Sequence, residues 1–254
     1  MSKLPNAHKF LDVSDYGRPF ARIIAKSLVK TNFTPIHVTI SFIISGLVAI
    51  ICILNYNFIL AAFFLILKSI LDAADGELAR LKNTPSYVGR YFDSVSDIIL
   101  NFLILLAIWH ITNGNLLYTF LAFLGIQLQG TLYNYYYVIL RNMFDGDTTS
   151  RIIEDESPTA LPGEKQKNVD LFFKLYTILY KGFDKTIYHL DKNASEGKPM
   201  PNWLMTFIST FGLGFQLLII SILLVFNLQQ FIIPFFIFYS ILIFVFIGIR
   251  KAFY

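Results

Sequence analysis

The stretch LDAADGELARLKNTPSYVGRYFDSVSD, residues 71–97, places four aspartates at the edges of two very apolar runs. Asp72 and Asp75 are three residues apart, and Asp93 and Asp97 are four apart, so each pair shares a face if both segments are helical. Burying a charge without compensation costs a large free energy. Some partner must therefore compensate these carboxylates, and the rest of the sequence indicates which environment supplies it.

The composition is that of a membrane protein. Of the 254 residues, 55% are hydrophobic and only 15% are charged, and the mean hydropathy is +0.57. This chain is too apolar for an ordinary soluble domain. The single cysteine, Cys52, excludes an intramolecular disulfide and a cysteine-based metal site. The net charge of +4 fits contact with anionic lipid and gives no footprint for nucleic acid.

Six apolar segments predict an all-α integral membrane protein with six transmembrane helices. They lie near residues 36–54, 58–80, 92–111, 116–140, 203–227 and 229–249. The connectors after the first, third and fifth segments, NYN, TNGN and NLQQ, contain no Lys or Arg. Apart from Lys68, the 21 basic residues cluster around the other span ends and in the segments beyond them. The positive-inside rule therefore predicts cytoplasmic termini and a cytoplasmic acidic stretch, in a bacterial inner membrane or an internal eukaryotic membrane.

The remaining segments are charged enough to stay outside the bilayer core. Residues 7–30 mix apolar and basic residues at helical spacing, which predicts an amphipathic helix along the inner membrane surface. A solvated cytoplasmic helix is the alternative. We expect one membrane-embedded domain over 1–254. Its parts are an interfacial N-terminal region (1–34), spans one to four (35–140), a cytoplasmic segment with an amphipathic helix (141–200) and spans five and six (201–254).

The acidic stretch predicts a metal-dependent site. On a helix, one stripe at the end of the second span carries Asp72, Asp75, Gly76, Ala79 and Arg80. The connecting loop contains turn-forming residues and is short enough to make the second and third spans antiparallel neighbours. The four carboxylates then converge and repel one another, and one or two divalent cations supply the compensation. Oxygen ligands suit Mg²⁺, Mn²⁺ or Ca²⁺, and paired metals are common in phosphoryl chemistry.

The pattern D-x2-D-G-x2-A-R-x8-G-x3-D-x3-D is complete over residues 72–97. It resembles the signature of the CDP-alcohol phosphatidyltransferases. The resemblance implies that two divalent cations, Mg²⁺ or Mn²⁺, bind Asp72, Asp75 and Asp93, with Asp97 contributing to one of them. It implies that Asp97 is also the general base. It further implies that the CDP moiety of the donor lies against Gly76, Ala79, Arg80 and Gly89.

The resemblance also implies a reaction and partners. The expected enzyme transfers a phosphatidyl group from a CDP-linked donor, CDP-diacylglycerol, to an alcohol hydroxyl, releases CMP, and forms a homodimer among membrane lipids. A CDP-choline/ethanolamine-type enzyme, which moves a head group onto a lipid hydroxyl, is the alternative. A cation transporter is a more distant one, since no discontinuous helices or paired halves are apparent.

Several further residues have two interpretations. We expect Lys68, one turn before Asp72, to be a structural counter-ion that pairs with that carboxylate, and a substrate contact is the alternative. The simplest alternative to a metal site is that Lys68, Arg80, Lys82 and Arg90 pair with the aspartates, but this leaves the spacing of the small residues unexplained. Arg141 and Arg151 flank a polar loop, where solvated surface charge is favoured over binding of an acceptor phosphate.

Two other segments near span ends have aromatic or turn-forming character. The tyrosines of YNYYYV, residues 133–138, predict an interfacial aromatic belt, with an aromatic wall for an amine or a sugar as the alternative. The first span begins with Pro35 and Thr39, as in the family pattern, but Ile36 replaces the usual Asn. This departure weakens any assignment of cytidine contacts to that segment.

Overall fold

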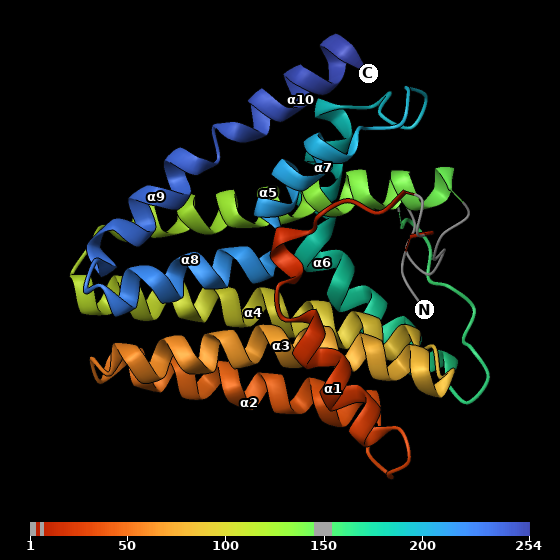
Figure 1. Cartoon of the computed structure of the whole chain (residues 1–254), viewed down its shortest axis with the longest axis horizontal. Helices are drawn as coiled ribbons and strands as arrows, with labels where there is room; N and C mark the ends of the chain where they lie inside the picture. The colour runs from red at the N-terminus through yellow and green to blue at the C-terminus, as the bar shows by residue number, and fades with distance from the viewer. Residues whose placement is uncertain (1–3, 6–7, 145–153) are drawn as a thin grey trace.

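Figure 1 shows the computed structural model, which describes residues 4–5, 8–144 and 154–254. Its described residues form helices and connections without strands. The first half contains η2 (Val13–Asp15), α1 (Arg18–Leu28), α2 (Pro35–Leu54), α3 (Phe58–Lys82), α4 (Tyr87–Thr112) and α5 (Leu116–Met143). The second half contains α6 (Gln166–Leu190), α7 (Asn202–Ile208), η3 (Ser209–Phe211), α8 (Leu213–Val225), η4 (Gln229–Phe231), α9 (Ile232–Tyr239) and α10 (Leu242–Phe253).

The ends of the long helices follow from local capping. Pro35 begins α2 behind Thr34, and His37 Nδ1 accepts a hydrogen bond from the Thr34 backbone N–H at 3.0 Å. Ser86 accepts a hydrogen bond from the backbone N–H of Gly89, so α4 begins at Tyr87 rather than near residue 92. The Ser86 cap fixes the end of the loop between α3 and α4, and the acidic motif lies on both sides of this loop.

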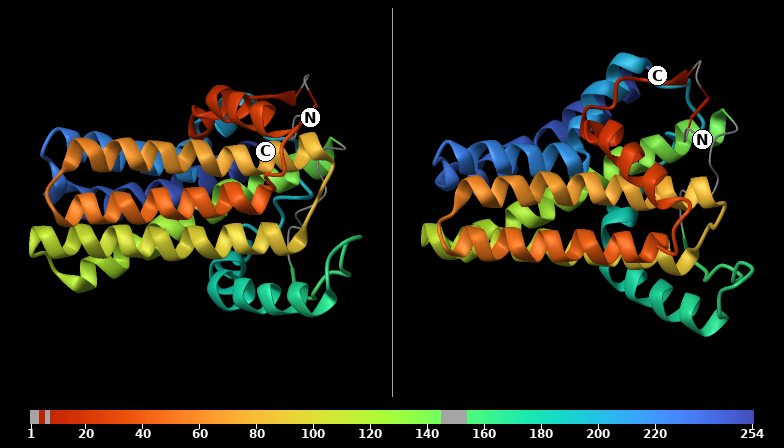
Figure 2. Two further views of the ribbon diagram at one scale, coloured as in Figure 1. Left: turned by 90° about the horizontal axis from the view of Figure 1, so that it is seen from below. Right: turned by 60° about the horizontal axis from the view of Figure 1, so that its bottom comes forward.

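Helix α2 packs against both α3 and α4 (Figure 2). Helices α3 and α4 meet through their charged side chains, since Lys68 Nζ on α3 lies 2.6 Å from Asp97 Oδ1 on α4. Small residues on α2 explain how it packs on both helices. The hydroxyl of Ser45 donates a hydrogen bond to the carbonyl of Phe64 on α3, at 2.8 Å. A Cβ on Gly46 would lie 2.9 Å from Leu100 of α4. The space between the α3 and α4 aspartates is therefore bounded by α2.

Four helical segments are long and apolar enough to cross a membrane, namely α2, α4, α5 and residues Gln229–Phe253. The bent pair of α7 with η3 and α8 makes a fifth if it is one span. Helix α3 is longer than α2, but it carries Lys68, Asp72 and Asp75 in its apolar part. The protein is thus an all-helical, multi-pass membrane protein, and the six-span expectation is supported in part.

The prediction of one continuous helix over 203–227 is wrong, because the chain bends by 55° at Gly212. The N-terminal turn η2 occupies the bend. The backbone N–H of Val13 donates to Ser209 Oγ at 3.0 Å. A Cβ on Gly214 would lie only 2.0 Å from the carbonyl oxygen of Ser14, so a residue without a side chain is required there.

The N-terminal helix is shorter than the expected 7–30 and covers Arg18–Leu28. It buries Ala21 and Ala25 completely, and these small side chains pack with Ala74 and Leu78 of α3. The opposite side of α1 is apolar and exposed, with Phe20 at 60%. Helix α1 therefore packs on α3 within the acidic motif, at Ala74 and Leu78.

Candidate active site

A cavity of about 1630 Å³ lies where α1, α2, α3, α4 and α5 meet the loop before α6. Its wall contains every site residue predicted from the sequence except Asp97, namely Asp72, Asp75, Gly76, Ala79, Arg80, Gly89 and Asp93. The motif thus forms one surface of the cavity. Pro35, Ile36 and Thr39 at the start of α2 form another part of the wall.

Three aspartates converge on this wall. Asp72, Asp75 and Asp93 each offer an oxygen within 4.8 Å of the other two. Thr39 Oγ1 on α2 donates a hydrogen bond to Asp75 Oδ2 at 2.7 Å and orients that carboxylate. Asp93 Oδ1 is buried and has no hydrogen-bond partner among the described residues. A cluster of carboxylate oxygens with one buried oxygen left over is the donor set of a hard divalent cation, so these residues fit a metal ion.

Asp97 has a different environment from the other three aspartates. Its Oδ1 lies 2.6 Å from Nζ of Lys68, which is completely buried and lies 4.9 Å from the centre of the Phe42 ring. The expectation that Lys68 pairs with Asp72 is therefore wrong. Asp97 is one turn further along α4 than Asp93, and α4 runs antiparallel to α3, which places it level with Lys68.

The other basic residues of the motif do not neutralise the converging aspartates. Arg80 pairs with Glu77 at 2.7 Å, and Arg90 pairs with Glu154 at 2.5 Å. Lys82 donates to the carbonyl oxygens of Thr31 and Phe33, which precede α2. In the described part of the chain, no Lys or Arg forms an ion pair with Asp72, Asp75 or Asp93. Among the four aspartates, an ion pair in the described part of the chain therefore compensates the charge of Asp97 only.

Glu77 organises the cationic side of the cavity, and sequence reasoning missed this role. Its buried carboxylate accepts from Arg80 at 2.7 Å, from Arg22 at 3.2 Å and from Arg18 at 3.4 Å. Arg18 and Arg80 also line the cavity. The spacing of Glu77 to Arg80 is visible in the sequence, but the approach of Arg18 depends on the packing of α1 on α3. One carboxylate thus holds two guanidinium groups at the cavity wall.

The segment before α6 completes the wall with residues 161–165. The Glu164 carboxylate accepts from Ser86 Oγ at 2.7 Å and from the backbone N–H groups of Val88 at 2.8 Å and Leu161 at 3.2 Å. Burial alone would raise the pKa of Glu164, but these hydrogen bonds outweigh it and lower the pKa below its usual value. Sequence reasoning had given this loop no role.

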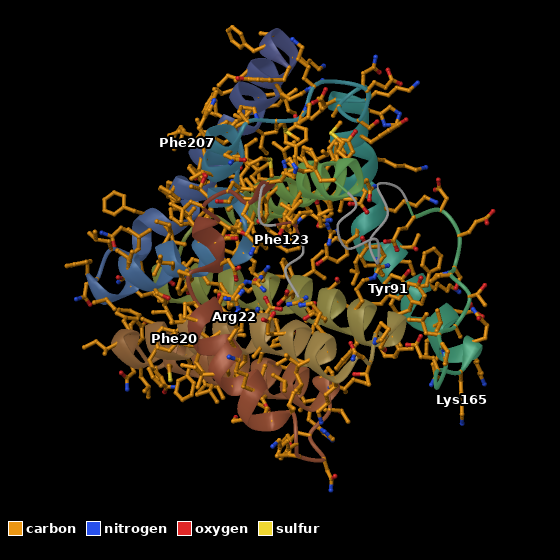
Figure 3. The ribbon with its side chains drawn as sticks, turned by 45° about the vertical axis from the view of Figure 1, so that its right-hand side comes forward. Phe20, Arg22, Tyr91, Phe123, Lys165 and Phe207 are labelled. Atoms are coloured by element: carbon orange, nitrogen blue, oxygen red, sulfur yellow. The ribbon has the colours of Figure 1, made fainter. Side chains whose placement is uncertain are left out.

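A second carboxylate attaches the same segment to α4. Glu154 accepts from Arg90 and, at 2.8 Å, from the hydroxyl of Tyr91. Tyr91 faces α6 (Figure 3), where its ring contacts Phe173 and Tyr176. Residues 154–165, before α6, are therefore bound to the motif through Glu154 and Glu164.

The end of α5 corrects two expectations. Arg141 is 3% exposed, lines the cavity and lies 5.3 Å from the ring of Tyr137, so it is not solvated surface charge. Tyr135 and Tyr136 are buried and donate to Asp191, so they are not an interfacial belt. Tyr133 lines the cavity beside Tyr137. The second cation considered for the acceptor, Arg151, lies outside the described residues.

The two glycines of the motif, Gly76 and Gly89, leave space for different groups. A Cβ on Gly89 would lie 3.2 Å from Ser86 Oγ, so a side chain there would press on the cap of α4. A Cβ on Gly76 would make only ordinary contacts with Arg80, the nearest at 3.6 Å. Gly76 therefore leaves its space open toward the cavity.

Comparisons with known proteins find a family over part of the chain. Residues 32–152 match the model of the CDP-alcohol phosphatidyltransferase family. A CDP-diacylglycerol–serine O-phosphatidyltransferase of Helicobacter pylori is 41% identical over 61 residues, which are 24% of this chain and 26% of that protein. One of Bacillus subtilis is 38% identical over 68 residues, or 27% and 38% of the two chains. The matches thus span well under half of these relatives. Residues 32–152, just under half of this chain, are thus similar to the CDP-alcohol phosphatidyltransferase family.

Proposed function

We propose that this protein transfers a phosphatidyl group from CDP-diacylglycerol to the hydroxyl of a small alcohol and releases CMP. The observation that carries the proposal is the convergence of Asp72, Asp75 and Asp93 on the wall of a large cavity within the family domain. The printed names of the similar proteins support CDP-diacylglycerol as donor and make serine the first acceptor to test.

We assign the site residues to the following roles. Asp72, Asp75 and Asp93, with Asp97 as a further ligand, hold two divalent cations, Mg²⁺ or Mn²⁺, which neutralise charge on the pyrophosphate when bound. The CDP moiety lies against Gly76, Ala79 and Gly89. Arg80, oriented by Glu77, donates hydrogen bonds to the donor phosphates. Fixed donors of this kind stabilise the charge that develops as CMP leaves.

The transfer exchanges one phosphorus–oxygen bond for another. The acceptor oxygen bonds to the phosphorus distal to the cytidine, and the bond from that phosphorus to the CMP oxygen breaks. Asp97 takes the acceptor proton as general base. In the structure Asp97 pairs with Lys68, and it is not among the residues that line the cavity.

The test of the reaction uses purified protein with CDP-diacylglycerol labelled in its cytidine, Mg²⁺ or Mn²⁺, and serine. We expect labelled CMP and phosphatidylserine to appear together, and EDTA to stop both. If CMP is released with another alcohol but not with serine, the proposed acceptor is wrong and the proposed donor stands. CMP only from CDP-choline or CDP-ethanolamine would establish the alternative transfer, and no CMP from any donor would refute the proposal and favour a transporter.

The test of the base is Asp97→Asn. We expect turnover to fall by about 10²–10⁴-fold, the usual contribution of a general base, while labelled CDP-diacylglycerol still binds. Glu156→Gln, an exposed site on the cytoplasmic segment, is the matched control and should keep full turnover. Normal turnover in Asp97→Asn would show that another group accepts the proton.

We further propose that α3 and the bent pair α7–α8 cross the membrane, which gives six spans with both termini and the cavity in the cytoplasm. The distribution of Lys and Arg supports this orientation. The N-terminal helix α1 then lies at the inner surface with Phe20 toward lipid. We also propose that the chain forms a single domain. From the family resemblance, we propose that two copies assemble into a homodimer.

A further inference from the structure

Helix α6 exposes an apolar stripe. Leu171, Leu175 and Ile178 are 56%, 39% and 69% exposed, and their spacing of four and three residues places them on one side of the helix. In water such a stripe leaves apolar surface hydrated at a cost in free energy. The described part of the chain covers none of the three fully, so the stripe is accessible to an external partner.

A row of lysines follows one edge of the stripe. At about 100° per residue, Lys167, Lys174 and Lys185 fall within one narrow sector next to Leu171 and Ile178. All three lysines are exposed. An apolar stripe with cations along its edge is complementary to a surface that offers acyl chains and anionic groups side by side.

The opposite side of α6 is fixed to the bundle, so the stripe cannot turn inward. Val169 and Ile187 are completely buried. The Phe172 ring lies 5.7 Å from that of Phe92 on α4, and the Tyr180 hydroxyl donates to the Ser94 carbonyl at 2.8 Å. The outward direction of the stripe is therefore set by contacts near both ends of the helix.

The position of α6 in the molecule fits a lipid surface. It crosses the outside of α4 and α5 and does not run along them, in the half of the molecule that contains the α3–α4 connection (Figures 1 and 2). Lys165, just before the helix, lies at the outer edge in Figure 3. A helix that crosses the spans near their cytoplasmic ends lies close to the plane of the head groups.

We propose that α6 lies in the cytoplasmic interface of an anionic membrane. Leu171, Leu175 and Ile178 contact the outer acyl region, and the lysine row contacts lipid phosphates. This inference rests on the orientation given under the proposed function. Because Glu164 joins the start of α6 to the cap of α4, lipid contact along α6 would hold residues 161–165 of the cavity wall at the membrane surface.

The test places a polarity-sensitive fluorophore on the full chain in vesicles, in a Cys52→Ala background. One label site is Ile178→Cys in the stripe, and its control is Asp170→Cys, exposed on α6 but away from the stripe. In phosphatidylcholine–phosphatidylglycerol vesicles we expect lipids brominated near the head group to quench the first label several-fold more than the second. Equal quenching at both sites would overturn the proposal.

Two further outcomes are decisive. If the label at 178 is shielded from iodide but brominated lipid does not quench it, and the shielding falls on dilution of protein in the membrane, the stripe binds a second copy and the lipid proposal is wrong.

The role of the lysine charge is tested by K167E/K174E/K185E, which we expect to lower lipid quenching at 178. The matched variant K192E/K198E/K251E changes the same charge outside α6 and should not. Quenching needs no turnover, so a failed reaction assay leaves this result unaffected.

Discussion

At the scale of single residues, the pair of Lys68 and Asp97 makes a testable contribution to stability. Replacing Lys68 by Met leaves Asp97 without its counter-ion beside a completely buried site. Breaking a buried ion pair from one side costs about 3–5 kcal/mol, because the remaining charge stays uncompensated. We therefore expect Lys68→Met to lower the thermal unfolding temperature in detergent markedly.

The double variant Lys68→Met with Asp97→Asn is the control for that measurement. Removing both charges leaves no uncompensated carboxylate, so the double variant should recover part of the lost stability. If the single variant is no less stable than the double one, the pair does not hold the two helices as the structure indicates.

Glu164 gives a prediction for pH dependence. Its folded-state pKa lies below the usual value of 4.5, so its stabilising effect is complete above that value and is lost as pH falls through the folded pKa. We expect Glu164→Gln to cost about 1 kcal/mol at neutral pH, a charge-assisted bond reduced by partial exposure. Unfolding temperatures from pH 7 to below pH 4 measure it. The variant should lose less stability on acidification than the parent chain, and parallel curves would contradict the assignment.

The residue scale also shows what the sequence can establish about the site. The spacing of Asp72 and Asp75 on one helix, with Asp93 at the start of the next, was sufficient to predict that carboxylates converge. The same spacing could not assign the partner of Lys68, because that depends on how far α4 is displaced along α3. Nor could it show Thr39 or Arg18 at the site, since both come from other helices.

At the scale of elements, the bend at Gly212 is the feature with the sharpest steric requirement. A Cβ on Gly214 meets the backbone of Ser14 at 2.0 Å, and backbone cannot rotate away as a side chain can. We expect Gly214→Ala to displace η2 and to destabilise the protein by about 1–3 kcal/mol, the usual cost of overpacking. Thermal unfolding in detergent measures the loss.

Gly248 provides the matched control for this substitution. It lies inside α10, and nothing lies within 4 Å of the place where its Cβ would be. Gly248→Ala should therefore leave the stability unchanged or raise it by up to about 1 kcal/mol, because alanine favours a helix interior. Equal behaviour of both variants would mean that η2 does not occupy the bend.

The sequence predicts the bounds of some helices better than those of others. The bounds of α2, α3 and α5 follow from local signals, since apolar runs end at Asn-rich turns and at Ser or Thr caps. The bend after α7 depends on the N-terminal turn, about two hundred residues earlier in the chain. A continuous apolar run therefore predicted one helix where tertiary contact makes two.

At the scale of the whole molecule, the number of spans is decided by helix α3. Because of its charged residues, α3 is not among the four helices apolar enough to cross a membrane, but it packs along α2 over nearly the whole of that helix (Figure 2). A short turn containing Tyr56 joins the two. If α2 crosses the membrane, α3 has to return beside it, and its buried Lys68–Asp97 pair lowers the cost of doing so.

Labelling from outside the cell tests this arrangement. In a Cys52→Ala background, we expect a cysteine at Tyr56, which is 62% exposed in the turn, to react with a membrane-impermeant maleimide in intact cells. A cysteine at Lys192, exposed after α6, should react only after permeabilisation, since the basic segments face the cytoplasm. Reaction at Lys192 in intact cells with protection at Tyr56 would invert the orientation. It would also place the cavity, and the helix α6 beside it, on the outer surface, where a cytosolic CDP-linked donor does not reach them.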